Sequence, residues 1–593
     1  MITLNRCKHA FLLYCFTCIL GSHSGVSKDH SELFRAMDDE ILRAMTDLHI
    51  DGLPRPYHIE ARLSMFSRIG GHATLGTLQD MDSTRINRLT VKIRVGTPKF
   101  DNTNFFDVSL GFFGSADDEE VFLNRTVPLE LDYATLRREL WLALDACYKQ
   151  SVEVYAKKLA SIKNRTRSDT TWDFGYMDPQ LVADTSLASL HFSTLTMRSM
   201  LEQVSDVFST ASNIQASRVT MEFVPSEELY ATSEGRHSYK YDVFTGFEIS
   251  ATTQALDGMP VNDAYAAYAI DPFDMPSVDS LRNAARRMIY NLEQQQKAVK
   301  IEAYSGPVLF TGQAAAEVFA QQFAPNLVAQ RAQATEGGFG LGRSPSMAFQ
   351  NKIGARVLPE FLSVKAQPSM QEFEGTPVAG HFEIDDEGVP TQDITLVDKG
   401  YLRNLLSSRT PTKRVKSTNG HYRNGGAMID VLRVTCSDKD RVLDNASIEA
   451  KLLKLVKDRE LEYGIIVSSV LDRNLQQTSL YQLTLGDMTF GSGQGAVPLL
   501  VVEKIFADGH RETIRGVEAA GFAPATFKDV LAVGSTSTVH NYLAPSVIPG
   551  YITGGSGYSI STIITPDLLF EDVEIRPLES DLPKLPLVQS PLN

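Results

Sequence analysis

The histidines of this chain are spaced too widely for the simplest kind of metal site. A zinc site on a helix uses two imidazoles about four residues apart on one face, with a carboxylate that activates water. Beyond residue 24 no two histidines lie three to five positions apart; they are His30, His49, His58, His72, His191, His237, His381, His421, His510 and His540. The sequence therefore predicts no single-helix zinc site, although a site assembled from distant loops stays possible.

A second candidate for chemistry is the segment from Glu374 to Arg409, which contains three consecutive acidic residues. Its pattern predicts a hairpin in which Gly388 adopts a positive φ. Asp385 to Glu387 could bind a cation through oxygen ligands, or could form a solvated acidic turn. His381 could be a ligand or a general base, or a hydrogen-bonded structural histidine.

A third candidate is the segment from Thr418 to Arg423. His421 and Arg423 could meet a substrate carboxylate, because a guanidinium offers two parallel donors. The alternative is a loop with Arg423 on the surface. Cys436 follows on a predicted strand, and we interpret it as a core cysteine because a nucleophilic thiol needs an adjacent base and partial exposure.

Between Ser305 and Pro325 an apolar run leads into an alanine-rich stretch that is predicted to be helical. The stretch resembles the HExxxH segment of the TldD/PmbA family, the "modulator of gyrase" metallopeptidases. In that register Gly312, Gln313 and Glu317 stand where the first His, the Glu and the second His would be. Glycine offers no ligand and glutamine cannot act as a base, so we predict no metal cofactor. Glu317 remains a candidate catalytic residue, like His381 and His421, and Gln313 a candidate substrate-binding residue, like Arg423.

Other segments resemble the same family, in the same order. They are the acidic turn that ends at Pro390, the stretch from Thr418 to Arg423, and a closing strand region from Ile564 to Glu574. The resemblance runs in pieces from about Arg62 to the end of that strand region. It implies a two-domain protomer and dimers that enclose a cavity in which an unfolded peptide is cut. In the family's paired systems one subunit carries the metal motif and its partner lacks it.

The elements that would position these residues fall into two halves. In the first, Ser31 to Leu48 and Tyr133 to Ala160 carry helical apolar stripes, and Leu89 to Val95 alternates as in a sheet with one solvated face. Beyond Lys300 the chain becomes rich in glycine and strand signals. We predict an α+β fold with a signal peptide at 1–24, a helix-on-sheet domain at 25–299, a β-rich, barrel-like domain at 300–577 and a proline-rich tail at 578–593.

The start of the chain and its charge bear on location and partners. Arg6 and Lys8 precede an apolar run from Ala10 to Leu20, which is typical of a secretory signal; an uncleaved anchor or a misplaced start codon is the alternative. We therefore expect export, to the periplasm or the extracellular space, with no later membrane span. A net charge of −15 argues against nucleic acid as a partner.

Three hypotheses follow. The first is an exported, metal-free TldD/PmbA-like protein that binds peptide or unfolded polypeptide, or completes a chamber as a homodimer or as a heterodimer with a family member. The second is an active metallopeptidase that binds zinc through divergent ligands among Glu317, His381 and His421. The third is a non-catalytic binding or assembly protein without a peptide cavity.

Overall fold

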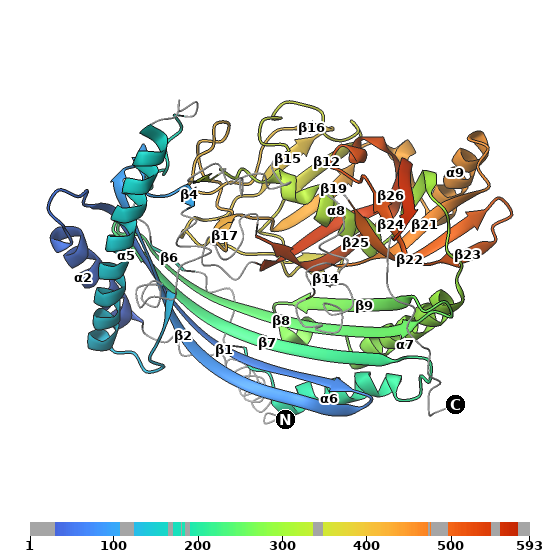
Figure 1. Cartoon of the computed structure of the whole chain (residues 1–593), viewed down its shortest axis with the longest axis horizontal. Helices are drawn as coiled ribbons and strands as arrows, with labels where there is room; N and C mark the ends of the chain where they lie inside the picture. Colours follow the sequence, from blue (N-terminus) through green and yellow to red (C-terminus); the bar gives the residue numbers. More distant parts are fainter. Residues whose placement is uncertain are drawn as a thin grey trace, which may run out of the picture.

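The computed structural model describes residues 30–106, 124–163, 170–178, 181–183, 190–331, 333–335, 348–472, 475, 496–546 and 558–578. They form a long curved sheet with helices, and a strand-rich body that lies over this sheet (Figure 1). The predicted α+β fold, helix-on-sheet first and β-rich second, is confirmed. The predicted signal peptide at 1–24 lies outside the described residues, as does the predicted tail beyond residue 578. Helix α7 ends at Lys297 and strand β10 begins at Tyr304, on either side of the predicted domain boundary.

Four long strands build the N-terminal sheet. They pair antiparallel in the order β2-β1-β7-β8. Shorter strands extend both edges, with β3 and β5 on β2, and β6 and β9 on β8. The bounds are β1 Pro56–Thr74, β2 Thr77–Thr97, β3 Phe100–Asp101, β5 Asn124–Val127, β6 Leu181–Ala183, β7 Ala216–Thr232, β8 His237–Gln254 and β9 Pro260–Ala269.

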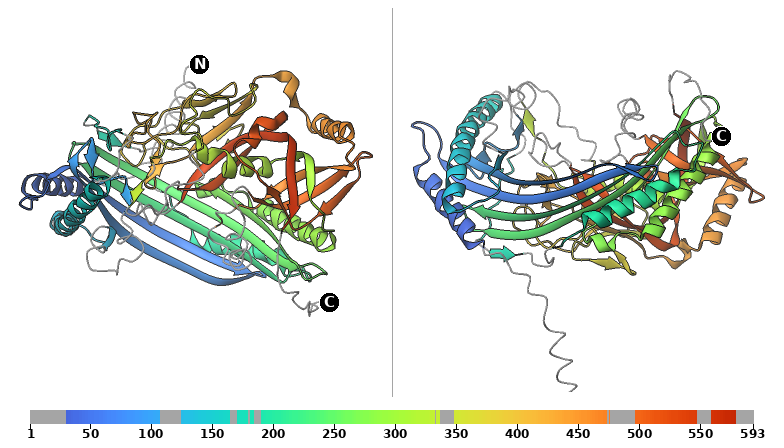
Figure 2. Two further views of the ribbon diagram at one scale, coloured as in Figure 1. Left: turned by 45° about the horizontal axis from the view of Figure 1, so that its top comes forward. Right: turned by 90° about the horizontal axis from the view of Figure 1, so that it is seen from below.

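Helices cover this sheet at its two ends. Helices α2 (Ser31–Asp47) and α5 (Tyr133–Lys163) lie at one end, and α6 (Thr194–Ser205) and α7 (Val278–Lys297) at the other (Figure 2). Each pair forms a separate apolar core with the strands. The predicted helices from Ser31 and from Tyr133 are confirmed, and α5 runs one turn further than its apolar stripe predicts.

The two faces of the sheet differ because side chains alternate along a strand. In β1, Ile59, Ala61 and Leu63 pack under α2 and α5, and in β7 the odd-numbered residues Val219, Met221 and Phe223 pack under α6 and α7. The even-numbered residues of the same strands therefore point to the opposite face, toward the C-terminal half. The predicted antiparallel sheet is present, but the face that was predicted to be solvated is covered by the second half of the chain.

The C-terminal half contains a closed ring of strands. The pairing runs β10-β21-β22-β24-β26, and β26 returns to β10, which makes the predicted barrel. A second branch continues from β26 through β19, β12, β15 and β16. The bounds are β10 Tyr304–Phe310, β12 Leu362–Ala366, β15 Ile394–Asp398, β16 Tyr401–Leu402, β19 Val431–Cys436, β21 Tyr463–Val470, β22 Val497–Phe506, β24 Val517–Ala520 and β26 Tyr558–Pro577.

Two helices and several short strands complete this half. Helix α8 (Gln313–Gln322) directly follows β10 and packs on β21, β25 and β26. Helix α9 (Asn445–Asp458) packs on β10, β21 and β25 through a separate apolar cluster (Figure 1). The other described strands of this half are β11 Ala334–Thr335, β13 Glu372–Phe373, β14 Thr376–Pro377, β17 Tyr422–Arg423, β18 Gly426–Ala427, β20 Val442–Leu443, β23 Arg511–Ile514 and β25 Val530–Pro545. Strand β4 (Phe105–Phe106) of the N-terminal half pairs with β11.

Candidate functional site

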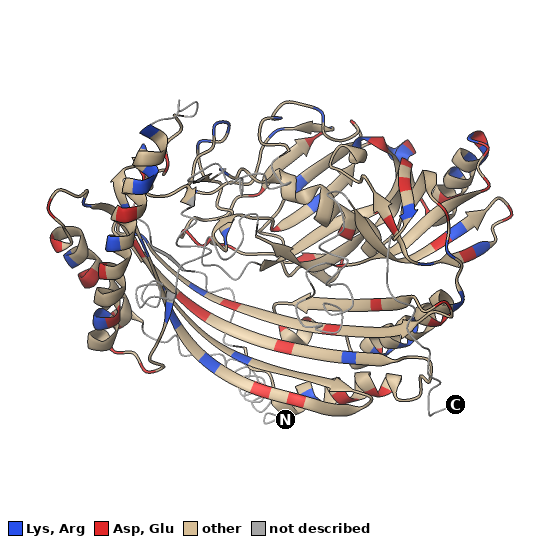
Figure 3. Cartoon of the chain, in the orientation of Figure 1, with Lys and Arg blue, Asp and Glu red and all other residues tan. Residues whose placement is uncertain are grey.

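A cleft of about 540 Å³ lies between the polar face of the N-terminal sheet and the C-terminal half. Most of its floor consists of even-numbered residues from β1, β2, β7 and β8. Basic and acidic residues both occur along these strands (Figure 3); those that line the cleft are basic on β1 and β2, acidic on β7 and of both signs on β8. The opposite wall comes from the segments 379–386, 422–425 and 558–560. The cleft therefore joins the sheet to two of the three segments that the sequence singled out.

Asp386 forms hydrogen bonds with residues from both walls of the cleft. Its Oδ1 accepts a hydrogen bond from Lys240 Nζ of β8 at 2.7 Å, and its Oδ2 accepts one from the backbone N–H of Asn424 at 2.8 Å. Arg62 of β1 donates to its backbone oxygen. Burial raises the pKa of Asp386, but Lys240 and Arg62 outweigh that effect and hold this pKa below its usual range.

The neighbours of Asp386 are buried rather than solvated, which corrects the interpretation of this segment as a solvated turn. Asp385 is completely buried and accepts hydrogen bonds from the backbone N–H groups of Glu387, Val389 and Tyr422. Glu387 is 4% exposed and accepts one from the backbone N–H of Arg409 at 2.8 Å. Burial raises the pKa of Asp385 to about 6 and, together with Asp385, raises that of Glu387 to about 8. The acidic run therefore holds the turn and the domain contact in place.

His381 and Arg423 both line the cleft. The Nδ1 atom of His381 lies 2.7 Å from the carbonyl oxygen of Val378 and donates to it, which leaves Nε2 as the acceptor of the neutral ring. The guanidinium of Arg423 lies over the ring of Phe382, at 4.7 Å, and donates from Nη1 to the carbonyl oxygen of Ile560 at 2.9 Å. Both predicted residues can therefore contact a molecule bound in the cleft.

His421 takes a different environment, because it is completely buried and is not a cleft residue. Its Nδ1 lies 2.9 Å from Asn419 Oδ1, an oxygen whose identity is fixed because it also accepts the backbone N–H of Ser407. Its Nε2 lies 2.8 Å from Asp430 Oδ2. The ring is thus held between a side-chain amide and a buried carboxylate, away from the cleft. His421 thus has the surroundings of a structural ion pair.

Glu317 is completely buried on α8, and both of its oxygens are occupied. Gln321 Nε2 donates to Oε1 at 2.7 Å, and His540 Nε2 of β25 lies 2.7 Å from Oε2. The ring of His540 stacks on Tyr542, whose hydroxyl is buried. His540 is a site residue that the sequence does not indicate, because it lies 223 positions from Glu317 and no spacing rule joins two residues so far apart.

The other two residues of the HExxxH register have structural contacts. The amide of Gln313 pairs with the backbone of Val470 in both directions, at 3.1 and 3.0 Å. Gly312 is the N-cap of α8, with φ 52° and ψ −122°, a conformation that strongly favours glycine. Its backbone N–H donates to Asp567 Oδ1 at 2.7 Å. The structure thus brings Glu317 together with His540, and not with His381 or His421.

The donor set at α8 does not fit a zinc ion. Structural and catalytic zinc sites use at least three protein ligands, and this position supplies one carboxylate and one imidazole, already bonded to each other. Within the described residues, no group of three or more His, Cys, Asp or Glu side chains is arranged to hold a metal ion. Of the two cysteines in the described parts, Cys147 is buried and Cys436 half-buried, and both are free.

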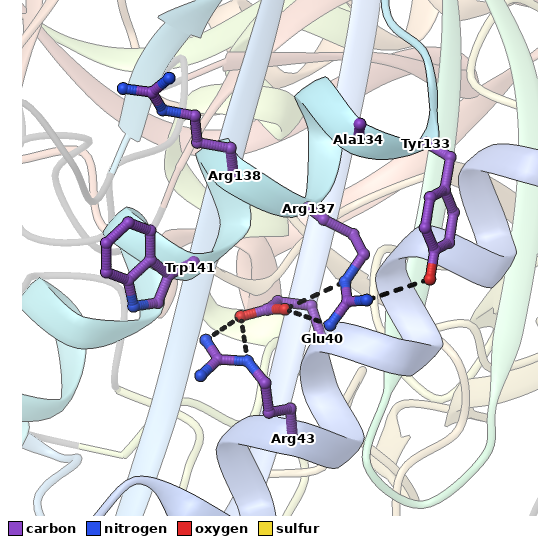
Figure 4. A pocket seen from close by; sticks show the side chains of 7 residues that line it. All are labelled: Glu40, Arg43, Tyr133, Ala134, Arg137, Arg138 and Trp141. Carbon is purple, nitrogen blue, oxygen red and sulfur yellow. Dashed lines mark hydrogen bonds and ion pairs between the residues drawn. The ribbon is translucent and has the colours of Figure 1, made fainter.

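A second, open hollow of about 370 Å³ lies between α2 and α5, remote from these residues (Figure 4). At its base the buried carboxylate of Glu40 accepts hydrogen bonds from Arg43 and from Arg137. Arg137 also donates to the hydroxyl of Tyr133. These contacts fix the angle between the two helices, and none of the candidate residues named above lines this hollow.

Known proteins resemble this chain in sequence, chiefly over its C-terminal half. The model of the PmbA/TldA metallopeptidase C-terminal domain matches residues 303–576. A protein named "Metalloprotease" from Archaeoglobus fulgidus is 27% identical over 86 residues, which are 14% of this chain and 19% of that protein. The match to this relative therefore spans about a fifth of its length.

Solved structures share the fold of nearly the whole chain. TldE from Thermococcus kodakarensis superposes with a TM-score of 0.54 and 13% identity, over 91% of this chain and 99% of that one. A protein described as a modulator of DNA gyrase from Bacteroides thetaiotaomicron gives 0.56 and 12%, over 93% and 100%. A similarly described protein from Thermotoga maritima gives 0.53 and 13%, over 92% and 100%. Residues 303–576 therefore form a C-terminal domain of the PmbA/TldD metallopeptidase family, and nearly the whole chain shares the fold of these solved proteins.

Proposed function

We propose that this chain is an exported, zinc-free member of the TldD/PmbA family that binds peptide or unfolded polypeptide in the cleft between its two halves. The observation that carries the proposal is the cleft itself. It is about 540 Å³ in volume, it is lined by both halves, and it contains the predicted residues His381 and Arg423. An interior filled by side chains would have favoured an assembly protein without a peptide cavity.

The loss of the zinc site is supported by the chemistry of α8. A zinc-binding helix needs imidazole or thiolate donors that are free to turn toward the metal. Here Gly312 has no side chain, Gln313 is bonded to the backbone of Val470, and the carboxylate of Glu317 is shared by His540 and Gln321. A buried carboxylate with an imidazole partner is satisfied without a metal ion.

Export and dimerisation belong to the same proposal. Export is supported by the basic and apolar pattern before residue 24. No helix of the described parts is long and apolar enough to cross a membrane. A dimer, with a second copy or with a family member that keeps the metal motif, would place the cleft inside a chamber.

The proposal is tested by measuring peptide binding and cleavage on one sample, with and without zinc. Fluorescence anisotropy of a labelled unfolded peptide, after chelation and again after zinc addition, should give equal affinities, and mass spectrometry should detect no cleavage. Zinc-dependent cleavage that disappears in Glu317→Ala would instead support the divergent metallopeptidase.

A substitution in the cleft, compared with a matched control outside it, tests whether the peptide binds in the cleft. Ser64 on the cleft face of β1 can be replaced by Trp to fill part of the cleft, and exposed Ser83 on the other face of β2 by the same residue. We expect Ser64→Trp to weaken binding at least about tenfold, an effect of about 1.4 kcal/mol. Ser83→Trp should leave binding unchanged, and equal effects of both variants would place the site elsewhere.

A further inference from the structure

The charged residues of the cleft are not fully balanced. Five basic and four acidic side chains line it: Arg62, Arg88, Lys92, Lys240 and Arg423, against Glu222, Glu228, Asp242 and Asp386. Paired charges on a sheet largely cancel each other's field, so an incoming ligand responds to the charges that are left over.

Most of these charges have partners. Arg62 pairs with Glu228, and Lys240 with Asp386 at 2.7 Å. Lys92 donates to the hydroxyl of Tyr422 at 3.1 Å and lies 3.9 Å from Glu60, and Glu222 pairs with Arg68 outside the cleft. Within the described residues, no carboxylate lies within 4 Å of the guanidinium of Arg88 or of Arg423. Asp242 lies 3.8 Å from Lys240, and its charge also acts on Arg423 from a greater distance. The cleft therefore holds two guanidinium groups, those of Arg88 and Arg423, without a directly bonded carboxylate.

Arg423 is the better placed of the two for specific recognition. The stacking on Phe382 and the hydrogen bond to Ile560 fix the plane of its guanidinium. This is its only hydrogen bond within the described part of the chain, so most of its five N–H groups remain available. A fixed guanidinium loses little entropy when it binds a carboxylate through two parallel hydrogen bonds. Arg88, by contrast, is exposed, and in the described part of the chain its guanidinium lies over the ring of Phe66 without a hydrogen bond that would fix its plane.

The surroundings of Arg423 are apolar on one side. Phe382 lies under the guanidinium, and Ile560 is paired with Leu543 across strands β26 and β25. All three side chains line the cleft. A ligand whose carboxylate binds Arg423 would therefore place the neighbouring part of the molecule against these apolar side chains. A peptide that ends in an apolar residue has this arrangement, because its last side chain lies next to its terminal carboxylate.

We propose that Arg423 binds the C-terminal carboxylate of the peptide, so that the cleft selects free C-termini with an apolar last residue. This inference rests on the proposed peptide-binding function and specifies which part of the peptide is recognised. Arg88 adds attraction for the same anion from the sheet.

The test compares one N-acetylated peptide that ends in leucine, as the free acid and as the C-terminal amide. Titration calorimetry with the full chain should show the free acid binding at least about tenfold more tightly, as expected for charge-assisted hydrogen bonds. Arg423→Gln should reduce the affinity for the acid to that for the amide and leave the amide unaffected. Arg88→Gln should lower the affinity for the acid only a few-fold, and mainly at low salt.

Three other results would contradict either the carboxylate inference or the proposed peptide-binding function. Equal binding of acid and amide by the wild-type chain, or an equal loss of both in Arg423→Gln, would overturn the carboxylate inference while the peptide-binding function stands. Arg423-dependent binding of an amidated peptide with an internal Glu, as tight as that of the acid, would show that any peptide carboxylate suffices and overturn selection of the C-terminus. No binding of any of these peptides would overturn the proposed function itself. Thermal unfolding of each variant, unchanged from wild type, confirms that the cleft is intact.

Discussion

Replacing Asp386 by Asn should weaken the contact between the two halves of the chain. The carboxylate receives Lys240 Nζ at 2.7 Å from β8, and both side chains are largely buried, with 21% of Asp386 and 7% of Lys240 exposed. Asparagine keeps an oxygen for the backbone N–H of Asn424 but removes the negative charge. Lys240 and Arg62 then remain in the cleft with less compensation.

The size of the effect follows from burial and from the partners that remain. Removing one member of a fully buried ion pair costs about 3–5 kcal/mol. Part of Asp386 is solvated, and Lys240 retains Glu228 at 3.4 Å. We therefore expect a loss of about 2 kcal/mol in the free energy of unfolding, below the fully buried range.

Urea unfolding followed by circular dichroism measures this loss. Asp393→Asn is the matched control, because Asp393 is exposed and accepts hydrogen bonds only from Ser369 in the described structure. The control should change the unfolding free energy by less than about 0.5 kcal/mol. If Asp386→Asn and Asp393→Asn unfold at the same urea concentration, Asp386 does not hold the two halves together.

Three further variants test other parts of the structure. Burial raises the pKa of Glu387 to about 8 from its usual 4.5. Between these pH values the folded chain binds one proton more than the unfolded chain, so the free energy of unfolding should increase from pH 9 to pH 6. Urea unfolding at both pH values should show a smaller difference for Glu387→Gln, and an unchanged difference would contradict the assignment. Gly312→Ala should cost about 1–2 kcal/mol through its positive φ alone, since the nearest atom to the new Cβ is 3.9 Å away; unchanged stability would show that the backbone relaxes. His540→Ala should cost about 2–3 kcal/mol, because the buried carboxylate of Glu317 then keeps only the hydrogen bond from Gln321 among its described partners. Glu317→Gln in the same chain should recover part of that loss, and no recovery would contradict this coupling.

Local patterns in the sequence predict much of the fold. The alternation in Leu89 to Val95 arises from a strand with one apolar and one polar face, and that polar face lines the cleft through Thr90 and Lys92. The apolar stripe of Tyr133 to Ala160 likewise arises from a helix with one buried face. Both signals are contained in a single element, so periodicity alone reveals them.

The site is less predictable because its partners are distant in sequence. Nothing near Glu317 indicates that His540 of β25 will meet it, since only the folded barrel brings α8 and β25 together. The burial of Asp385 and Glu387 is equally hidden, because three acidic residues in a row are typical of a solvated turn. Their backbone partners and the contact with the N-terminal sheet become apparent only in three dimensions.

The central claim is that the HExxxH position of this TldD/PmbA protein no longer binds zinc. The most direct test is inductively coupled plasma mass spectrometry of the full chain, purified from cells grown with added zinc. Because a zinc ion held by fewer than three protein ligands binds weakly, we predict far less than one zinc ion per chain. One tightly held zinc ion per chain, lost in Glu317→Ala or His540→Ala, would contradict the claim.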